Sequence, residues 1–258
     1  MKKVFVHVLK SVRSWLLIML LIPFGLLFSE NMETPADNYK PPTEVSGTIA
    51  EDTVWTIDRS PYLVRATITI SPNVILTIEP GVEVLIVQNQ DFIVNGTLRA
   101  VGNEANPIVF TGTAQVPGWW RSINIQGEGS AFLEWCEVSF AGASTGAGVL
   151  KAGSGSLRLV NSVVRRVMGD GLRISAGYSS FESINNTFMY NTNGVRVGIN
   201  ASYSDQSSTF ILNQVDIHLD GGAITGIVKW GASGDYSMTV TGDVSVNAGA
   251  SLEIAPGT

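Results

Sequence analysis

The nine residues Val74–Val82, with the sequence VILTIEPGV, decide how the rest of the chain is interpreted. Leu76 and Ile78 alternate with polar residues, as in a strand with one buried face, and Pro80-Gly81 ends the segment as a turn. A second copy, ASLEIAPGT, occupies residues 250–258, and its Leu, Ile, Pro and Gly all follow those of the first copy at one fixed offset. This pair of segments indicates a protein built from repeats.

Short apolar runs separated by turn residues continue from about Ile49 to the end of the chain. Most of them alternate at period two, and no twelve-residue window after Gly47 has a helical period. Of the 258 residues, 45% are apolar and only 15% are charged, and 27 are glycines, which suits one all-β domain with a large core. The clearest runs are residues 66–70, 92–94, 108–110, 123–125, 157–159 and 172–174.

The spacing of these runs predicts a solenoid. Residues 135, 161, 186 and 213 begin similar segments, at steps of 26, 25 and 27 residues. The strands Gly171–Ile174 and Gly194–Val197 share the pattern Gly, apolar, Arg, apolar. A period in the twenties with several short strands per period is typical of stacked coils. We therefore expect an all-β fold, a single-stranded parallel β-helix, with roughly eight coils between Tyr62 and Thr258.

Five segments carry a resemblance to a known superfamily: LTIEPGV (76–82), FIVNGTLRAVG (92–102), NPIVFTG (106–112), WWRSINI (119–125) and LEWCEVSFAG (133–142). They resemble the secreted right-handed parallel β-helix proteins of bacteria in the pectate-lyase-like superfamily, and their order is similar to that of a non-catalytic subgroup. The resemblance implies a right-handed β-helix from Val54 onward. It implies little about function, because that superfamily mixes lyases, hydrolases, adhesins and inert scaffolds.

Residues 1–29 have the pattern of an export signal. Four basic residues and no acidic ones occur there, and residues 15–28 form an apolar run that ends before Ser29, at the expected cleavage position. This run is short for a membrane-spanning helix, so a cleaved signal peptide is favoured, with an uncleaved membrane anchor as the alternative. In either case we expect an exported protein that is secreted or held at the cell surface.

Three further segments follow from the pattern. Residues 30–47 are polar and contain three prolines, which predicts a flexible linker. Residues 48–258 are expected to form the β-helix, with Val54–Tyr62 covering its N-terminal end. Residues 230–258 repeat the Trp, Tyr and Pro-Gly of the first unit and are expected to begin a second one. We therefore expect the natural protein to continue beyond Thr258 into further C-terminal domains.

The charge and the cysteine content exclude several classes of function. After residue 29 the chain has 12 basic and 22 acidic residues, a net charge of −10, which argues against binding to nucleic acid or to anionic membranes. Cys136 is the only cysteine, so an internal disulfide is excluded, and it is expected to be buried as a small apolar residue. His218 is the only histidine after residue 29, and one histidine without further cysteines does not make a zinc site.

Two arginines are candidates for binding an anionic ligand. Arg173 and Arg196 are expected to point outward from adjacent coils, one above the other. Like charges in such a ladder repel each other and attract an anion. The anion is either an acidic saccharide or a carboxylate of the chain itself, such as Glu182.

Candidate catalytic residues come from the acids and the histidine. Asp216, His218 and Asp220 alternate along one strand, so they share a face, and His218 between two acids suits general acid–base catalysis. We also expect Arg166 and Asn191 to stack with His218. Asp170, Asn193 and Asp220 each precede a glycine, and turn formation is the favoured interpretation over a carboxylate pair for glycoside hydrolysis.

A calcium ion is expected only if the chain is a lyase. The resemblance to pectate lyases implies a basic residue beside acidic residues that hold calcium. No cluster of acids is visible beside Arg173 and Arg196, which lowers the weight of that interpretation.

Asparagines and tryptophans complete the set of candidates. Asn161, Asn186 and Asn213 are expected to form a structural ladder of stacked amides at one corner of the coils. Trp119 and Trp120 are consecutive, so in a strand one of them points outward and becomes a candidate for stacking on a sugar ring. The core is expected to contain Trp120 or Trp135.

The sequence favours a structural, adhesive or glycan-binding module that is exported to the cell surface or secreted. The alternative is a polysaccharide lyase or glycoside hydrolase that acts on an acidic polysaccharide. Convergence of several acids with Arg173 or Arg196 would distinguish the enzyme from the module.

One prediction concerns the last coil. If residues 230–258 begin a second unit, the purified 258-residue chain exposes an apolar end, and we expect it to self-associate. Light scattering over a range of concentrations measures this, and a heat-stable, monodisperse monomer would contradict it.

Overall fold

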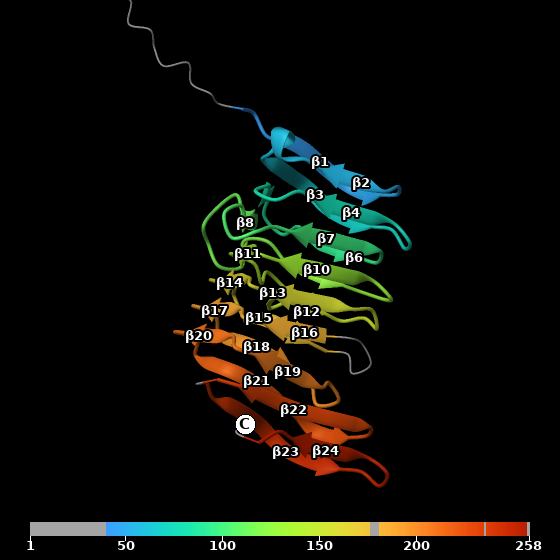
Figure 1. Ribbon diagram of the computed structural model, residues 1–258, viewed down its shortest axis with the longest axis vertical. Coiled ribbons are helices and arrows are strands. Elements are labelled where there is room, and N and C mark those ends of the chain that lie inside the picture. The colour runs from blue at the N-terminus through green and yellow to red at the C-terminus, as the bar shows by residue number, and fades with distance from the viewer. Residues whose placement is uncertain (1–39, 176–180, 235, 257–258) are drawn as a thin grey trace, which may run out of the picture. The chain divides into compact units, whose positions relative to one another are not determined.

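The computed structural model describes residues 40–175, 181–234 and 236–256, which belong to a compact unit that begins at Lys40. In this unit nearly every element is a short strand, and the strands pair in parallel with those of the coils before and after (Figure 1). The predicted fold class is therefore confirmed: the chain is a parallel β-solenoid, with about eight turns.

Each coil contributes strands to three parallel ladders, which run along the stack of coils. Ladder 1 consists of β2 (Thr53–Trp55), β4 (Ile75–Ile78), β7 (Thr97–Val101), β10 (Ser130–Glu134), β13 (Leu157–Val160), β16 (Phe181–Ile184), β19 (Tyr203–Gln206), β22 (Ile227–Ser233) and β24 (Ser251–Ile254). Ladder 2 consists of β5 (Glu83–Ile86), β8 (Ile108–Gly112), β11 (Cys136–Ser139), β14 (Val163–Arg165), β17 (Thr187–Met189) and β20 (Thr209–Ile211). Ladder 3 consists of β6 (Phe92–Val94), β9 (Ile123–Ile125), β12 (Ala147–Lys151), β15 (Asp170–Ile174), β18 (Asn193–Val197), β21 (Val215–Ile224) and β23 (Met238–Val246).

Ladders 2 and 3 join at the N-terminal end of the unit. The long strand β3 (Tyr62–Ile70) pairs with β5 through its first half and with β6 through its second half. Strand β1 (Thr43–Ile49) lies along both halves of β3. The helical element that the described residues contain is a 3₁₀ turn at Ile57–Arg59.

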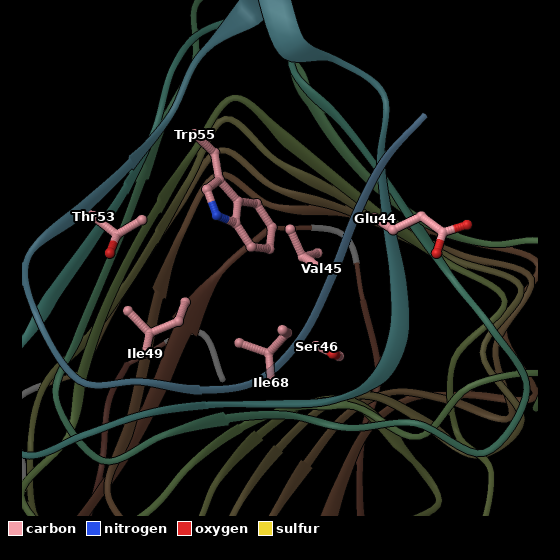
Figure 2. A pocket seen from close by; sticks show the side chains of 7 residues that line it. All are labelled: Glu44, Val45, Ser46, Ile49, Thr53, Trp55 and Ile68. Carbon is pink, nitrogen blue, oxygen red and sulfur yellow. The ribbon is translucent and has the colours of Figure 1, made fainter. Parts of the chain in front are cut away.

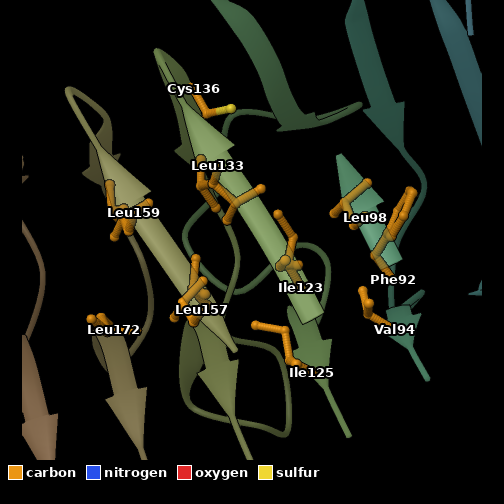
Figure 3. Packing of buried hydrophobic residues seen from close by; sticks show 14 of the residues in the cluster. Phe92, Val94, Leu98, Ile123, Ile125, Leu133, Cys136, Leu157, Leu159 and Leu172 are labelled. Atoms are coloured by element: carbon orange, nitrogen blue, oxygen red, sulfur yellow. The ribbon is translucent and has the colours of Figure 1, made fainter. Parts of the chain in front are cut away.

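The core lies inside the coils. Inward residues stack in register from one coil to the next, as with Leu76, Leu98, Ala131 and Leu157 of ladder 1, each at most 1% exposed. Figure 3 shows leucines of ladder 1 and residues of β6 and β9 in this cluster. Complete burial of a leucine or isoleucine contributes about 1.5–3 kcal/mol, so the repeated column is the main source of stability.

Cys136 is buried in the same core, as predicted. Removal from water raises the pKa of its thiol far above the usual range, because burial penalises the thiolate. The thiol therefore behaves as a small apolar group.

Two predictions about the N-terminal end are wrong. The linker predicted for residues 30–47 does not extend to Gly47, since residues 43–49 form β1, which is hydrogen-bonded along β3. The residues predicted to cover the end of the stack, Val54–Tyr62, instead take part in the first coils through β2 and β3. Alternating Val45 and Ile49 with an intervening glycine was the signal for a strand in the predicted linker.

The interior contains a cavity at the N-terminal end of the part of the chain that the structure describes. This cavity of about 380 Å³ is lined by residues of β1, β2 and β3, with the indole of Trp55 and the side chain of Ile68 directed into it (Figure 2). Trp55 itself is stacked on Tyr62, with ring centroids 4.7 Å apart.

The last coils have the same strand pairing as the first ones. Gly47 and Ile49 of β1 pair with Ile68 and Ile70, and Gly222 and Ile224 of β21 pair in the same way with Val244 and Val246. A register shift precedes each of the two glycines, and both have positive φ.

The tryptophans of the two ends are equivalent as well. Trp55 lies opposite Ile78 on the next coil, and Trp230 lies opposite Ile254 in the same way. These two isoleucines belong to the two copies of the repeated segment. The sequence repeat therefore has a counterpart in the strand pairing.

A lysine occupies one inward position. Lys151 pairs with Ile125 and Ile174 of the neighbouring coils and is fully buried. Its ammonium donates a hydrogen bond to the carbonyl of Gly153. Desolvation lowers the pKa of this lysine to about 8. A charge in this apolar column therefore opposes folding.

We predict that Lys151→Met increases the free energy of unfolding at pH 7 by about 1–2 kcal/mol. The folded pKa lies below the ordinary value of 10.5, so the native chain should gain stability as the pH rises from about 8 to 10.5. We expect this gain to be about 1–2 kcal/mol, because exposed residues flank Gly153 and solvent screens the ammonium in part. The variant should lack it.

Urea unfolding at several pH values measures both effects. Lys229→Met is the matched control, since the exposed Lys229 pairs with Glu253 at the surface. An identical pH profile for Lys151→Met and the native chain would show that the buried amine has no such effect.

Candidate functional site

The outer face of ladder 3 brings several predicted residues together. Arg173, Arg196 and His218 lie in register on consecutive strands, so the stacking predicted for the two arginines is confirmed. Asp220 joins Arg196 to His218, since its Oδ1 lies 2.8 Å from the guanidinium and 3.3 Å from Nε2.

Both arginines have partners within the chain. Arg173 donates to Asp170 at 2.6 Å and to the carbonyls of Thr145 and Gly146 at 2.9 and 3.2 Å. Arg196 donates from Nε to Asp220 at 2.9 Å. The structure thus supplies carboxylates of the chain as the predicted anions, although not from Glu182.

Glu182 takes part in a different ion-pair row, on ladder 1. It lies beside Arg158, which also pairs with Glu134 at 2.8 Å. The two glutamates raise the pKa of Arg158. This row spans three coils on the outer side of ladder 1.

His218 is arranged for structural hydrogen bonding. Its Nε2 lies 2.9 Å from Thr241 Oγ1, so the hydroxyl and the Asp220 carboxylate approach the same ring nitrogen. In a nucleophile–histidine–aspartate relay the carboxylate binds Nδ1 and leaves Nε2 for the nucleophile. Asp216 is engaged separately, because it accepts from the amide and hydroxyl of Ser237 at 3.2 and 3.3 Å.

The turn positions predicted for Asp170, Asn193 and Asp220 are wrong. Asp170 and Asn193 begin β15 and β18, are buried, and bond to each other at 2.6 Å. The residue in register with Asn193 on β21 is Val215, not Asp220. Gly171, which follows Asp170, is required by close packing and not by a turn. A Cβ at this position would lie 2.6 Å from the carbonyl oxygen of Gly194. Close contact between coils therefore requires this glycine.

The predicted asparagine ladder is also wrong in register. Asn161 accepts a hydrogen bond from Asn185, and Asn213 accepts one from the backbone of Asn191. Asn186 bonds instead to the backbone of the coil before it. The three predicted members therefore do not stack on one another.

The cause of this error is a change in coil length. On ladder 1, Leu133 lies opposite Leu159, Leu159 opposite Ser183, and Ser183 opposite Asp205. Each of these steps along the sequence is shorter than the one before, whereas a nearly constant step was expected. Residues that are chosen at a constant interval in the sequence therefore fall out of register after one coil.

Because of the same change in coil length, Arg166, Asn191 and His218 do not form the stack that was predicted for them. The ring system next to Arg166 is formed by Phe140 and Tyr190. Asn191 bonds to the backbone of the preceding coil, and His218 lies on ladder 3.

The two tryptophans lie in the loop between β8 and β9 rather than in a strand. Trp120 is fully buried and donates to the carbonyl of Ser139 at 2.8 Å, so its place in the core is confirmed and a sugar contact by Trp120 is excluded. Trp119 is half-buried against the core and donates to Thr113 Oγ1 at 2.9 Å. Trp119 therefore offers only part of its surface to a ligand.

One buried polar cluster was missed by the sequence interpretation. Asp205 is 3% exposed and accepts hydrogen bonds from the amide and hydroxyl of Ser208, at 3.1 and 2.6 Å, and from the hydroxyl of Ser183. The buried hydroxyl of the neighbouring Tyr203 has no hydrogen-bond partner among the described residues, and burial and the Asp205 charge raise the pKa of this tyrosine. The alternation in β19 was the available signal, since it places Tyr203 and Asp205 on the inner side.

Two searches of the described residues complete the description of the site. Within residues 40–175, 181–234 and 236–256, no three His, Cys, Asp or Glu side chains are grouped so as to hold a metal ion. The part of the chain that the structure describes contains no helix long and apolar enough to cross a membrane.

Comparisons with known proteins give one partial likeness. No family model and no solved structure matches the chain. The Drosophila melanogaster protein named Protein bark beetle is 34% identical over 82 residues, which are 32% of this chain. The matched segment is 2% of that much longer protein, so the likeness concerns a single segment.

The geometry predicts unequal effects for two carboxylates of the site. Asp170→Asn should lower the free energy of unfolding by about 2–3 kcal/mol, because the Asp170 side chain is 2% exposed and Arg173 loses its charged partner. Asp220→Asn should cost less than about 1 kcal/mol, since both side chains of that pair are roughly one-third exposed. Chemical unfolding compares the two variants, and equal losses would contradict the assignment.

Proposed function

We propose that the chain is an exported β-solenoid scaffold, a structural or adhesive module whose outer faces bind other surface components. The observation that supports it best is the arrangement of the outer charges. Arg158, Arg165 and Arg196 each pair with an acid on a neighbouring coil. These ion pairs link successive coils, as expected where the outer residues maintain a regular stack.

Export is part of this proposal and depends on residues 1–29. A basic segment followed by an apolar run is the pattern of a secretory signal. These residues lie outside the described part of the chain, so the support comes from the sequence.

A glycan partner is the second part of the proposal. Arg173, Arg196 and Trp119 keep partial exposure on the outside of the solenoid, which supports contact with an acidic polysaccharide or a cell-surface glycan. Their internal hydrogen bonds compete with such a ligand. We therefore assign them to weak, distributed contacts.

A polysaccharide lyase or hydrolase is the competing function. One observation favours it: Arg196, Asp220 and His218 form a contiguous cluster that contains an acid, a cation and an acid–base group. Against it, Asp216 is directed to Ser237, and Asp170 is buried beneath Arg173. A calcium ion belongs to this competing proposal alone.

The test is incubation of the purified protein with a panel of acidic and neutral polysaccharides, with and without calcium. Binding is measured by retention on immobilised glycan, and cleavage by the appearance of unsaturated or reducing ends. We expect no cleavage of any glycan. Cleavage that falls about 100-fold or more in both His218→Ala and His218→Gln would support the enzyme and reject the scaffold, because glutamine can keep the hydrogen bond to Thr241 but cannot transfer a proton.

A further inference from the structure

Four large side chains occupy one corner of the solenoid in an unfavourable backbone conformation. Phe140, Arg166, Tyr190 and Leu212 directly follow the strands of ladder 2 and have φ values of 61°, 54°, 58° and 52°. We call these four residues the 140–212 corner. The same backbone hydrogen bond recurs along it, from the amide of each residue to the carbonyl that precedes the next residue of the corner. Positive φ favours glycine and asparagine over such bulky residues.

The other corner with this geometry shows that the turn itself does not require large side chains. Between ladders 1 and 2 the equivalent residues with positive φ are Trp135, Asn161, Asn185 and Ser207. Three of these four are small and polar, as the conformation favours. The side chains of the 140–212 corner are therefore retained at a cost in backbone energy, a pattern that is associated with functional surfaces.

Arg166, Tyr190 and Leu212 form an exposed strip, whereas Phe140, at 4% exposure, is buried beside it. The guanidinium of Arg166 lies between the rings of Phe140 and Tyr190, at 5.9 and 5.8 Å from their centroids. Tyr190 is 47% exposed and Leu212 is 72% exposed. Two residues after Arg166, the exposed Met168 lies against Gly118 of the loop between β8 and β9, which also exposes Val116.

Within the described residues, no carboxylate pairs with the guanidinium of Arg166. Arg121, Arg158, Arg165, Arg173 and Arg196 all pair with carboxylates, whereas Arg166, like Arg59 and Arg99, has no ion pair in the part of the chain that the structure describes. The chain after residue 29 has a net charge of −10, so an exposed unpaired arginine contrasts with its surroundings. Contact with two rings restricts the guanidinium, and a guanidinium with free N–H groups can donate two parallel hydrogen bonds to a carboxylate.

We propose that the 140–212 corner, with Met168, binds a short acidic segment of a partner protein. A carboxylate of that segment pairs with Arg166, and its apolar side chains pack on Tyr190, Leu212 and Met168. Aromatic residues, Met and Arg are the types enriched at protein–protein contacts, which favours a protein over a glycan. Two coil steps of about 4.8 Å separate Arg166 from Leu212, which gives an exposed strip of about 10 Å, the length of roughly three extended residues.

The test uses the full chain and a fluorescent peptide in which one glutamate lies between leucine and phenylalanine residues. Fluorescence anisotropy should show saturable binding, and Arg166→Ala should weaken it about tenfold or more. The peptide with glutamine in place of glutamate should bind weakly to the native chain. Arg99→Ala is the matched control, because Arg99 also lies over an aromatic ring, Phe132, at 5.9 Å but outside the corner. It should leave the affinity unchanged.

Leu212→Asn separates binding from folding. Asparagine suits the positive φ of this exposed position, so the melting temperature should stay the same or rise while the affinity for the peptide falls several-fold. Three results would overturn the proposal: no saturation up to about 1 mM peptide, equal losses in Arg166→Ala and Arg99→Ala, or unchanged affinity in Leu212→Asn. Binding of polygalacturonate, but not of the peptide, that is lost in Arg166→Ala would assign the corner to a glycan and also overturn it.

Discussion

Parallel hydrogen bonding between successive coils is the constraint on which the rest of the structure depends. Each coil is held at about 4.8 Å from its neighbours along all three ladders, so a residue of an inner strand has a fixed partner above and below. An inward column is therefore favoured when its members are all apolar, as Leu76, Leu98, Ala131 and Leu157 are. An outward charged residue is likewise favoured where the neighbouring coil places an opposite charge beside it. Ion pairs between coils therefore stabilise the stack, and a ligand has to compete with them for the same charges.

This constraint explains why the strands and ladders were predictable and the register was not. Alternation of apolar residues at short intervals reports one buried face, and it identified the fold. The register depends on the length of each corner, and the coils become shorter between β10 and β19. An expected constant period thus placed Asn161 and Asn186 in one ladder, although they lie in adjacent rows. A small drift of this kind is enough to exchange an exposed amide for a buried one.

The candidate site was predictable to a similar extent. Stacking of Arg173 on Arg196 was predicted from a local pattern that both strands share. The prediction therefore remained correct although the length of the coils changes. The partners of these arginines did not follow, because Asp170 lies in the same strand just before Arg173 and appeared to belong to a turn. The corner positions with positive φ could not be recognised from the sequence either, because Phe, Arg, Tyr and Leu occupy them rather than glycine. Sequence patterns report favourable conformations, and these residues are in an unfavourable one.

That contrast separates two kinds of surface on the solenoid. On ladders 1 and 3 outer charges such as Arg158 and Arg196 pair with acids of neighbouring coils, which is consistent with a scaffold in which these faces maintain a regular stack. At the 140–212 corner the local conformation opposes the residues that occupy it, and the cation there has no acid beside it in the described chain. If stacking of the coils were the only requirement, asparagine would be more favourable at these corner positions, as it is at Asn161 and Asn185. Ion pairing accounts for the outer faces and burial accounts for Phe140, whereas Arg166, Tyr190 and Leu212 are exposed, and contact with a partner is the cause that we propose for them.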